Sequence, residues 1–179
     1  LVTCQNYRGK EKDIFVLGDS HGLHLVAGLS ENFPDHNIYV FYLSACVPQS
    51  GRLGYVRDLR SSRERRECVQ RNKDAMRFLA AYKPSTVIIS NANRAEPELL
   101  GRITNEMLDE LAKAGHTAFM LGDFIRPGMR LNSCFSVPDV VVSDEMLARR
   151  CVGRQALGDK EIAYNRAMAE IVHGFVDPA

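Results

Sequence analysis

Short apolar runs recur along the chain and are separated by segments with a different spacing of apolar residues. The run 13–18 reads Asp-Ile-Phe-Val-Leu-Gly, and an unbroken apolar stretch that ends in glycine predicts a buried parallel strand. Comparable runs predict further strands at 38–43, 86–90, 116–121 and 175–177. The pattern therefore indicates a sheet whose strands are covered on both faces.

Between these runs the apolar residues recur at helical spacing. A first helix follows the first strand, and Pro34 comes after its expected end. Further helices are expected over 67–82, 97–114 and 160–172, whereas 44–66 reads as a loop. Strands that alternate with helices predict an α/β fold, with a doubly wound, mainly parallel five-stranded sheet flanked by helices in a three-layer sandwich.

The length of 179 residues fits one domain, and no repeat or linker divides it, so we expect a single domain over 1–179. The net charge of +1 gives no electrostatic reason to expect nucleic acid as a partner. No apolar run approaches the ~20 residues that span a bilayer. The sequence starts at Leu1 and stops at Ala179 without a recognisable terminus, and we expect it to be a piece of a longer polypeptide.

The cysteines form no Cys-x-x-Cys pair, which argues against a zinc knuckle or thioredoxin chemistry. Four of them lie in stretches that read as loops, as the local pairs Cys46 with Cys68 and Cys134 with Cys151. Each pair would close a loop of ~20 residues and contribute ~3 kcal/mol if bridged. Such pairs favour an oxidising compartment. Buried free thiols in a cytosolic protein are the alternative, and Cys4 is left without a partner in this pairing.

Small and polar residues follow the predicted strands, among them Ser20 after the first strand and Asn91 and Asn93 after the third. In open α/β sheets functional groups gather at the carboxyl ends of the strands, so we expect a site at this edge. Ser20 stands where a strand turns into a helix, close to unpaired N–H groups that favour developing negative charge. Serine at such a turn is also an ordinary N-cap, and from position alone that is the commoner interpretation.

The string Leu-Gly-Asp-Ser-His-Gly at 17–22 resembles the first block of the SGNH hydrolases, which is Gly-Asp-Ser after an apolar strand. With His-Leu at 24–25, it is similar to the SGNH domain joined to membrane acyltransferases of family 3, which O-acylate cell-surface polysaccharides. Segments 43–48, 83–89 and 165–178 resemble, in order, that group's Ser-Gly-Cys-Pro segment, its third strand, and its last helix and strand. The likeness covers nearly the whole chain.

The resemblance implies roles for particular residues. Ser20 matches the nucleophile, and its backbone N–H matches one donor of an oxyanion hole. Ala45 stands where the family has a glycine whose N–H is another donor, and it can serve only if its backbone angles are allowed. Asp19 is expected to organise the turn, and His21 to support the site by packing or hydrogen bonding.

The third block of the family is Gly-x-Asn-Asp, and the corresponding stretch here is Asn-Ala-Asn-Arg at 91–94. Asn93 then matches the asparagine whose side-chain amide completes the oxyanion hole. Asn91 replaces the glycine, which is tolerable because asparagine also visits left-handed backbone conformations. Arg94 departs from the pattern. Turn chemistry after a strand is the alternative explanation for both asparagines.

The family's fourth block, Asp-x-x-His, supplies the base and its orienting carboxylate, and a serine hydroxyl without a base is a weak nucleophile. None of the five histidines has an aspartate three residues before it. We therefore expect this block to lie outside residues 1–179. His21 and His24 lie near Ser20, but packing at the helix start is the favoured interpretation. With Asp19 they form no known set of metal ligands.

These observations predict a serine-dependent O-acyltransferase that passes an acyl group, acetyl above all, through an acyl-serine to hydroxyls of a cell-surface polysaccharide or lipopolysaccharide. The expected partners are an acyl donor, a carbohydrate acceptor and a membrane acyltransferase domain in the same polypeptide. We expect no cofactor and no metal, and a periplasmic or extracellular location on an inner-membrane protein. The alternatives are a carbohydrate O-acetyl esterase and a non-catalytic carbohydrate-binding or docking module. A flavodoxin-like or receiver-like domain is less favoured, because neither a phosphate-binding glycine loop nor an acidic cluster with a matching lysine is present.

Overall fold

The computed structural model describes residues 3–6, 9–42, 45–50, 61–92, 96–122 and 159–177, with 3–6 and 159–161 described through their backbone alone. Its strands are β1 (Thr3–Asn6), β2 (Lys12–Gly18), β3 (His36–Tyr42), β4 (Thr86–Ser90), β5 (Thr117–Leu121) and β6 (Phe175–Val176). Its helices are α1 (Ser20–Asn32), α2 (Ser62–Ala80), α3 (Pro97–Lys113) and α6 (Asp159–Ile171). All five predicted strands and all four predicted helices are present, mostly within two residues of the expected bounds.

The strands form one sheet in the order β1-β3-β2-β4-β5-β6. β2, β3, β4, β5 and β6 are parallel to one another, which confirms the predicted parallel five-stranded sheet. β1 was not predicted; it pairs antiparallel with β3 at the edge of the sheet. β2 is the first parallel strand along the chain, and the following strands lie on both sides of it. The strand order therefore reverses between β2 and β4, which is where such sheets bind ligands.

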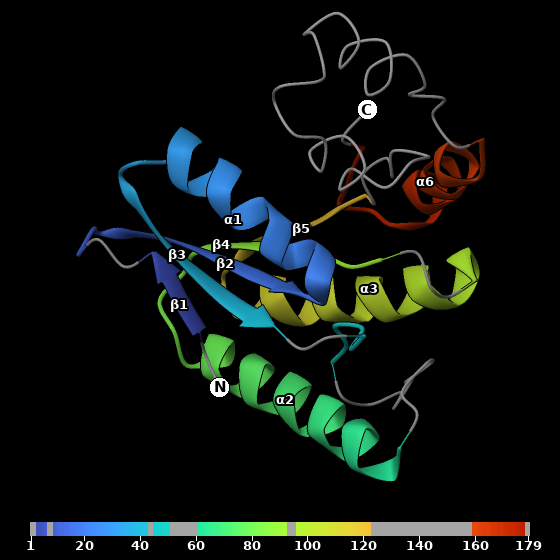
Figure 1. Ribbon diagram of the computed structural model, residues 1–179, viewed down its shortest axis with the longest axis horizontal. Helices are drawn as coiled ribbons and strands as arrows, with labels where there is room; N and C mark the ends of the chain where they lie inside the picture. Colours follow the sequence, from blue (N-terminus) through green and yellow to red (C-terminus); the bar gives the residue numbers. More distant parts are fainter. Residues whose placement is uncertain are drawn as a thin grey trace, which may run out of the picture.

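The sheet lies between two helical layers (Figure 1). α1 packs on one face, where Leu25, Val26 and Leu29 contact a small cluster that includes Ile14. α2, α3 and α6 cover the other face, over a larger cluster that includes Phe15. This division follows from right-handed crossovers, because the chain moves along the sheet in one direction through α1, from β2 to β3, and in the opposite direction through α2, α3 and α6. The central strand is apolar throughout because both of its faces are buried.

α2 differs from its prediction at its start. It begins at Ser62, five residues before the predicted start, so the end of the predicted loop 44–66 was wrong. A capping box explains the earlier start: the Ser61 hydroxyl accepts from the Glu64 N–H, and the Glu64 carboxylate accepts from the Ser61 N–H at 2.8 Å. The first turn of α2 consists mainly of charged residues, so the spacing of apolar residues did not reveal it. Cys68 consequently lies in a helix and not in a loop.

A buried carboxylate links several segments at the amino ends of the parallel strands, which we call the amino edge. Asp13, at the start of β2, is 5% exposed. It accepts hydrogen bonds from the Asn37 amide at 2.7 Å and the Tyr82 hydroxyl at 3.2 Å, and it pairs with Lys83 at 2.9 Å. Because these residues come from β3 and from the segment between α2 and β4, the network fixes three parts of the chain at this edge.

Candidate active site

Ser20 is the first residue of α1 and lies two residues after the end of β2. Gly18, the last residue of β2, pairs with Tyr42 on β3 and with Ser90 on β4, so all three strands end at the same level. Ser20 therefore lies at the carboxyl ends of the parallel strands, which we call the carboxyl edge, at the point where the strand order reverses. Its side chain is neither fully buried nor fully exposed. This is the position in which an open α/β sheet presents groups to a ligand.

Asp19, and not Ser20, is the N-cap of α1. Its carboxylate accepts a hydrogen bond from the His21 N–H at 2.9 Å. The same carboxylate accepts a hydrogen bond from the Ala92 N–H at 3.2 Å, and Asp19 is 1% exposed. The capping role that competed for Ser20 thus falls to its neighbour. Asp19 also joins the turn after β2 to the turn after β4, the two segments that the resemblance places in the site.

The turn is compact because glycine stands at its two crowded positions. A Cβ on Gly18 would overlap the Ser90 carbonyl oxygen on the neighbouring strand. A Cβ on Gly22 would lie 3.2 Å from a methyl group of Val16, which is tighter than ordinary packing. Glycine therefore allows β2, β4 and the start of α1 to approach one another closely. The glycine of the Gly-Asp-Ser string is therefore required by packing.

Ala45 has a backbone φ of 56°, in the left-handed region. Among the residues that the structure describes, it is the one non-glycine residue with a positive φ. Alanine pays about 1–2 kcal/mol for this conformation, which glycine adopts without steric cost. The φ angle of Ala45 therefore lies in a region that alanine rarely adopts. Its oxyanion role stays a prediction.

The third predicted block is described only in part. Asn91 is 1% exposed, and its amide nitrogen donates to the Ala92 carbonyl at 3.1 Å. Its side-chain oxygen is buried and has no hydrogen-bond partner within the described part of the chain, and the same holds for the Ser90 hydroxyl. Asn93 and Arg94 lie outside the described residues, so the predicted approach of Asn93 to Ser20 stays a prediction.

The five histidines separate into two groups by their place along the strands. His36 begins β3, His116 precedes β5 and His173 precedes β6, and parallel strands begin at the edge opposite to Ser20. His21 and His24 lie in the first two turns of α1, with ring centroids 6.0 Å apart and planes 15° apart. His21 is 9% exposed and its backbone is held by Asp19. Only this pair lies near Ser20.

Cys46 and Cys68 form a disulfide, as predicted, and their sulfur atoms lie 2.03 Å apart. Cys134 and Cys151 lie outside the described residues, so their predicted pairing stays a prediction. Asn72 had not been recognised from the sequence. Its amide donates to the Val47 carbonyl at 3.0 Å and lies within 3.7 Å of both sulfur atoms. The signal was its position four residues after Cys68, which places both on one face of α2.

Arg71 is a second residue that the sequence did not single out. Burial lowers the pKa of its guanidinium to about 10, and the nearby Tyr42 phenol opposes that shift. One terminal nitrogen of Arg71 is buried without a hydrogen-bond partner among the described residues. Because Tyr42 ends β3 at the level of Gly18, this partly desolvated cation lies on the side of the molecule that carries the carboxyl edge.

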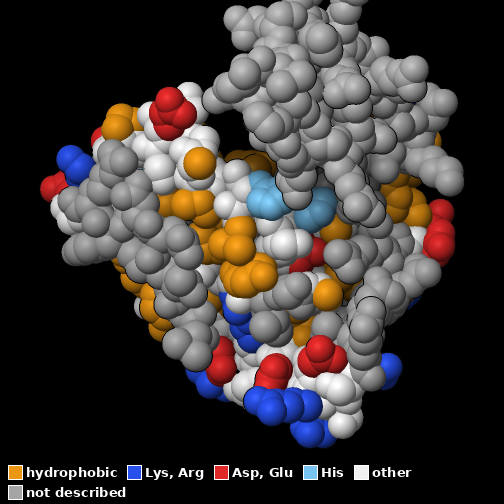
Figure 2. All heavy atoms as spheres, viewed as in Figure 1, with side chains coloured by type: hydrophobic (Ala, Val, Ile, Leu, Met, Phe, Trp, Pro, Cys, Tyr) orange, Lys and Arg blue, Asp and Glu red, His pale blue; other side chains and the backbone are white. Residues whose placement is uncertain are grey.

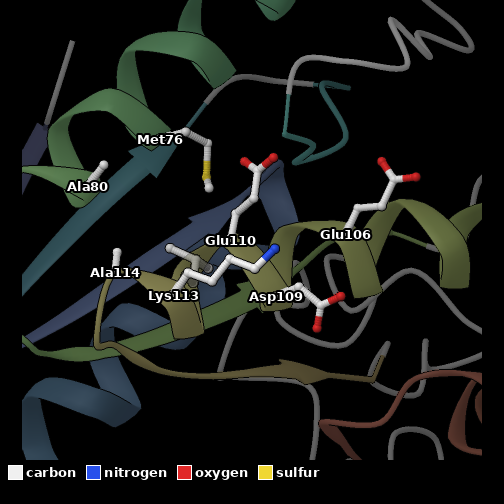
Figure 3. A pocket seen from close by; sticks show the side chains of 8 residues that line it. Met76, Ala80, Glu106, Asp109, Glu110, Lys113 and Ala114 are labelled. Carbon is white, nitrogen blue, oxygen red and sulfur yellow. The ribbon is translucent and has the colours of Figure 1, made fainter.

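A cavity of about 560 Å³ lies away from this edge, between α2 and α3 (Figure 3). Carboxylates of Glu106, Asp109 and Glu110 lie along it, with Lys113 and Met76. None of its lining residues belongs to the turns around Ser20. Figure 2 shows one face of the molecule, with histidine side chains near its middle, hydrophobic side chains beside them and most charged side chains toward the periphery.

The fold and the turn at Ser20 define an α/β domain whose candidate nucleophile follows its first parallel strand. A family model described as the SGNH domain fused to AT3 domains matches residues 3–178, and the chain belongs to this family. The resemblance seen in the sequence is thereby confirmed. A comparison with curated proteins found no match.

Family membership supports an acyltransferase- or esterase-type role and a membrane acyltransferase domain in the same polypeptide. It therefore fits a domain that works beside a membrane. In the ranges that the structure describes, no helix is both long enough and apolar enough to cross a bilayer.

Proposed function

We propose that this domain is an O-acyltransferase that uses Ser20 as nucleophile and transfers an acetyl group to hydroxyls of a cell-surface polysaccharide or lipopolysaccharide. The proposal depends chiefly on one observation: Ser20 lies at the strand-order reversal while Asp19 takes over the helix cap. Its hydroxyl is therefore not needed to start α1. The family supports the reaction class, and the substrate is the proposal's own extension.

In the first half of the reaction the Ser20 hydroxyl oxygen attacks the carbonyl carbon of the acyl donor while a base accepts its proton. The tetrahedral oxyanion is stabilised by the N–H groups of Ser20 and Ala45 and by the side-chain amide of Asn93. The base gives that proton to the donor's leaving group as the bond to it breaks, which leaves an acyl-serine. In the second half a sugar hydroxyl attacks the acyl carbonyl carbon and gives its proton to the base. The ester bond to Ser20 then breaks, and the base returns the proton to the Ser20 oxygen.

The base is proposed to be a histidine of an Asp-x-x-His block that lies outside residues 1–179 of the polypeptide. No histidine of this sequence has an aspartate three residues before it. Three of the five histidines belong to the opposite edge of the sheet, and His21 is held as part of the helix start. Within this domain, Asp19 acts as a positioning residue, because its carboxylate holds the turns that carry the nucleophile and the oxyanion donors.

The test is acetyl transfer by the full-length protein and by its Ser20→Ala variant. Transfer to the polysaccharide and hydrolysis of p-nitrophenyl acetate are both measured. We expect kcat to fall on the order of 10³-fold or more, because removing a catalytic serine leaves only binding and oxyanion stabilisation. Peptide mass spectrometry of the wild type with excess acetyl donor should detect acetylation of Ser20, which the variant cannot carry.

Ser30→Ala is the matched control, since this serine lies on the same helix and its buried hydroxyl has no hydrogen-bond partner among the described residues. It should leave both rates unchanged. Equal rates for Ser20→Ala and wild type would remove Ser20 from the reaction and favour a binding or docking module. Hydrolysis that depends on Ser20 without any transfer to a sugar would identify an esterase instead.

A further inference from the structure

Ala45 occupies a conformation that its own chemistry disfavours. Its φ of 56° lies in the left-handed region, where a Cβ meets the backbone. Residues in such conformations persist only where the surrounding structure over-determines them, and they cluster at functional sites. Something beyond local preference must therefore hold Ala45 in place.

The segment that follows has few backbone constraints of its own. Residues 45–50 belong to no helix or strand, yet Cys46, Val47 and Gln49 are at most 3% exposed. A buried segment without ladder hydrogen bonds depends on side-chain and covalent contacts for its position. Two residues on one face of α2 supply contacts of this kind.

Two residues of α2 hold this segment. Cys68, fully buried, is bonded to Cys46 across a sequence separation of 22 residues. Asn72, one turn later, donates to the Val47 carbonyl at 3.0 Å and contacts the sulfur atoms of both cysteines. Ala45 itself packs against the two cysteines. The bond and the amide thus act on the two residues that directly follow Ala45.

We propose that the Cys46–Cys68 disulfide and Asn72 are positioning groups that hold Ala45 left-handed, so that its N–H is presented to the oxyanion formed on Ser20. This inference rests on the proposed function. We call the three residues the α2 clamp. Without the clamp, Ala45 relaxes toward the extended region, which alanine prefers, and its N–H turns away from the reacting carbonyl.

The prediction concerns kcat, because an oxyanion donor acts on charge that develops in the transition state. Replacing both cysteines by serine in the full-length protein should lower kcat by about 10- to 100-fold, with KM changed less than about threefold. Asn72→Ala should lower kcat in the same direction and to a smaller extent. Gln70→Ala is the matched control on α2, since its side chain is exposed and contacts Asp74; it should leave kcat unchanged.

A double-mutant cycle separates positioning from general stability. The disulfide is removed from the wild-type protein and from the Ala45→Gly variant, and the two losses of kcat are compared. Glycine reaches the left-handed region without help, so the loss should be at least about threefold smaller in that background. Equal losses in both backgrounds, or an unchanged kcat without the disulfide, would overturn the clamp.

A further variant covers the case in which the protein without the disulfide fails to fold. Ala45→Val keeps both cysteines, but a β-branched residue strongly resists a positive φ. Its kcat should fall at least about tenfold while the disulfide still forms, and full activity would overturn the clamp. Ser20→Ala is measured in the same assay. If Ser20→Ala is inactive, the results of the clamp variants test the clamp alone. If Ser20→Ala is fully active, the proposed function is overturned and the clamp with it.

Discussion

The two edges of the parallel sheet carry similar polar side chains but hold them differently. At the amino edge, Asp13 has an amide, a hydroxyl and an ammonium as partners. His116 is likewise satisfied on both ring nitrogens: it accepts from the Ser85 N–H and donates to the Leu79 carbonyl at 2.8 Å. Polar groups at this edge therefore serve to hold the fold together.

At the carboxyl ends of the strands Asp19 is hydrogen-bonded, but within the described part of the chain other polar groups nearby are not. The Ser90 hydroxyl and the Asn91 carbonyl oxygen are buried without hydrogen-bond partners among the described residues. Ala45 has a disfavoured backbone, and Ser20 is left out of the helix cap. Unsatisfied groups and strained backbone cost stability, and proteins retain them mainly where a site needs them. The difference between the two ends of the strands agrees with the proposed site around Ser20.

Asp19→Ala should have the largest effect, because it changes both stability and activity at the carboxyl edge. The variant loses the helix cap and leaves the His21 and Ala92 N–H groups without their acceptor. We expect the free energy of unfolding to fall by about 2 kcal/mol and kcat by about 100-fold. Urea denaturation and acetyl-transfer rates measure the two effects. Wild-type kcat in this variant would contradict the positioning role of Asp19.

Asp13→Ala is the matched change at the other end of β2, and it should affect stability alone. The variant removes a buried carboxylate with three partners, which should lower the free energy of unfolding by about 3 kcal/mol. The kcat of the folded enzyme should equal that of the wild type. A tenfold loss of kcat with unchanged stability would erase the distinction between the two edges.

Lys83→Met should have the smallest effect and should show it mainly in alkali. The hydrogen bond to Asp13 raises the pKa of the Lys83 ammonium above its usual 10.5. A raised pKa in the folded state gives a stabilisation that is complete below pH 10.5 and is lost as pH rises through the folded-state pKa. Urea midpoints of the wild type should therefore fall more steeply than those of the variant above pH 10.5. Parallel curves would show that the ion pair does not affect folding.

Much of the scaffold could be predicted from sequence because its signals are local. Each parallel strand is a short apolar run, and each helix has its own periodicity, capping residue or proline. The strand ends then place Ser20 and Asn91 at one edge without any knowledge of contacts. β1 escaped prediction because Thr-Cys-Gln-Asn has no apolar pattern and is a strand through its pairing with β3.

The sequence by itself determined the α/β fold and the end of the strands at which the candidate nucleophile lies, and it offered Cys46 with Cys68 as a candidate pair that the structure shows bonded. Only the tertiary structure decided that Asp19 caps α1, that the φ of Ala45 is left-handed and that the Asn72 amide donates to the Val47 carbonyl. The reason is physical. Apolar periodicity depends on residues that are neighbours in the sequence. The hydrogen bond between Ala92 and Asp19 joins residues 73 positions apart, so it exists only once the sheet has formed.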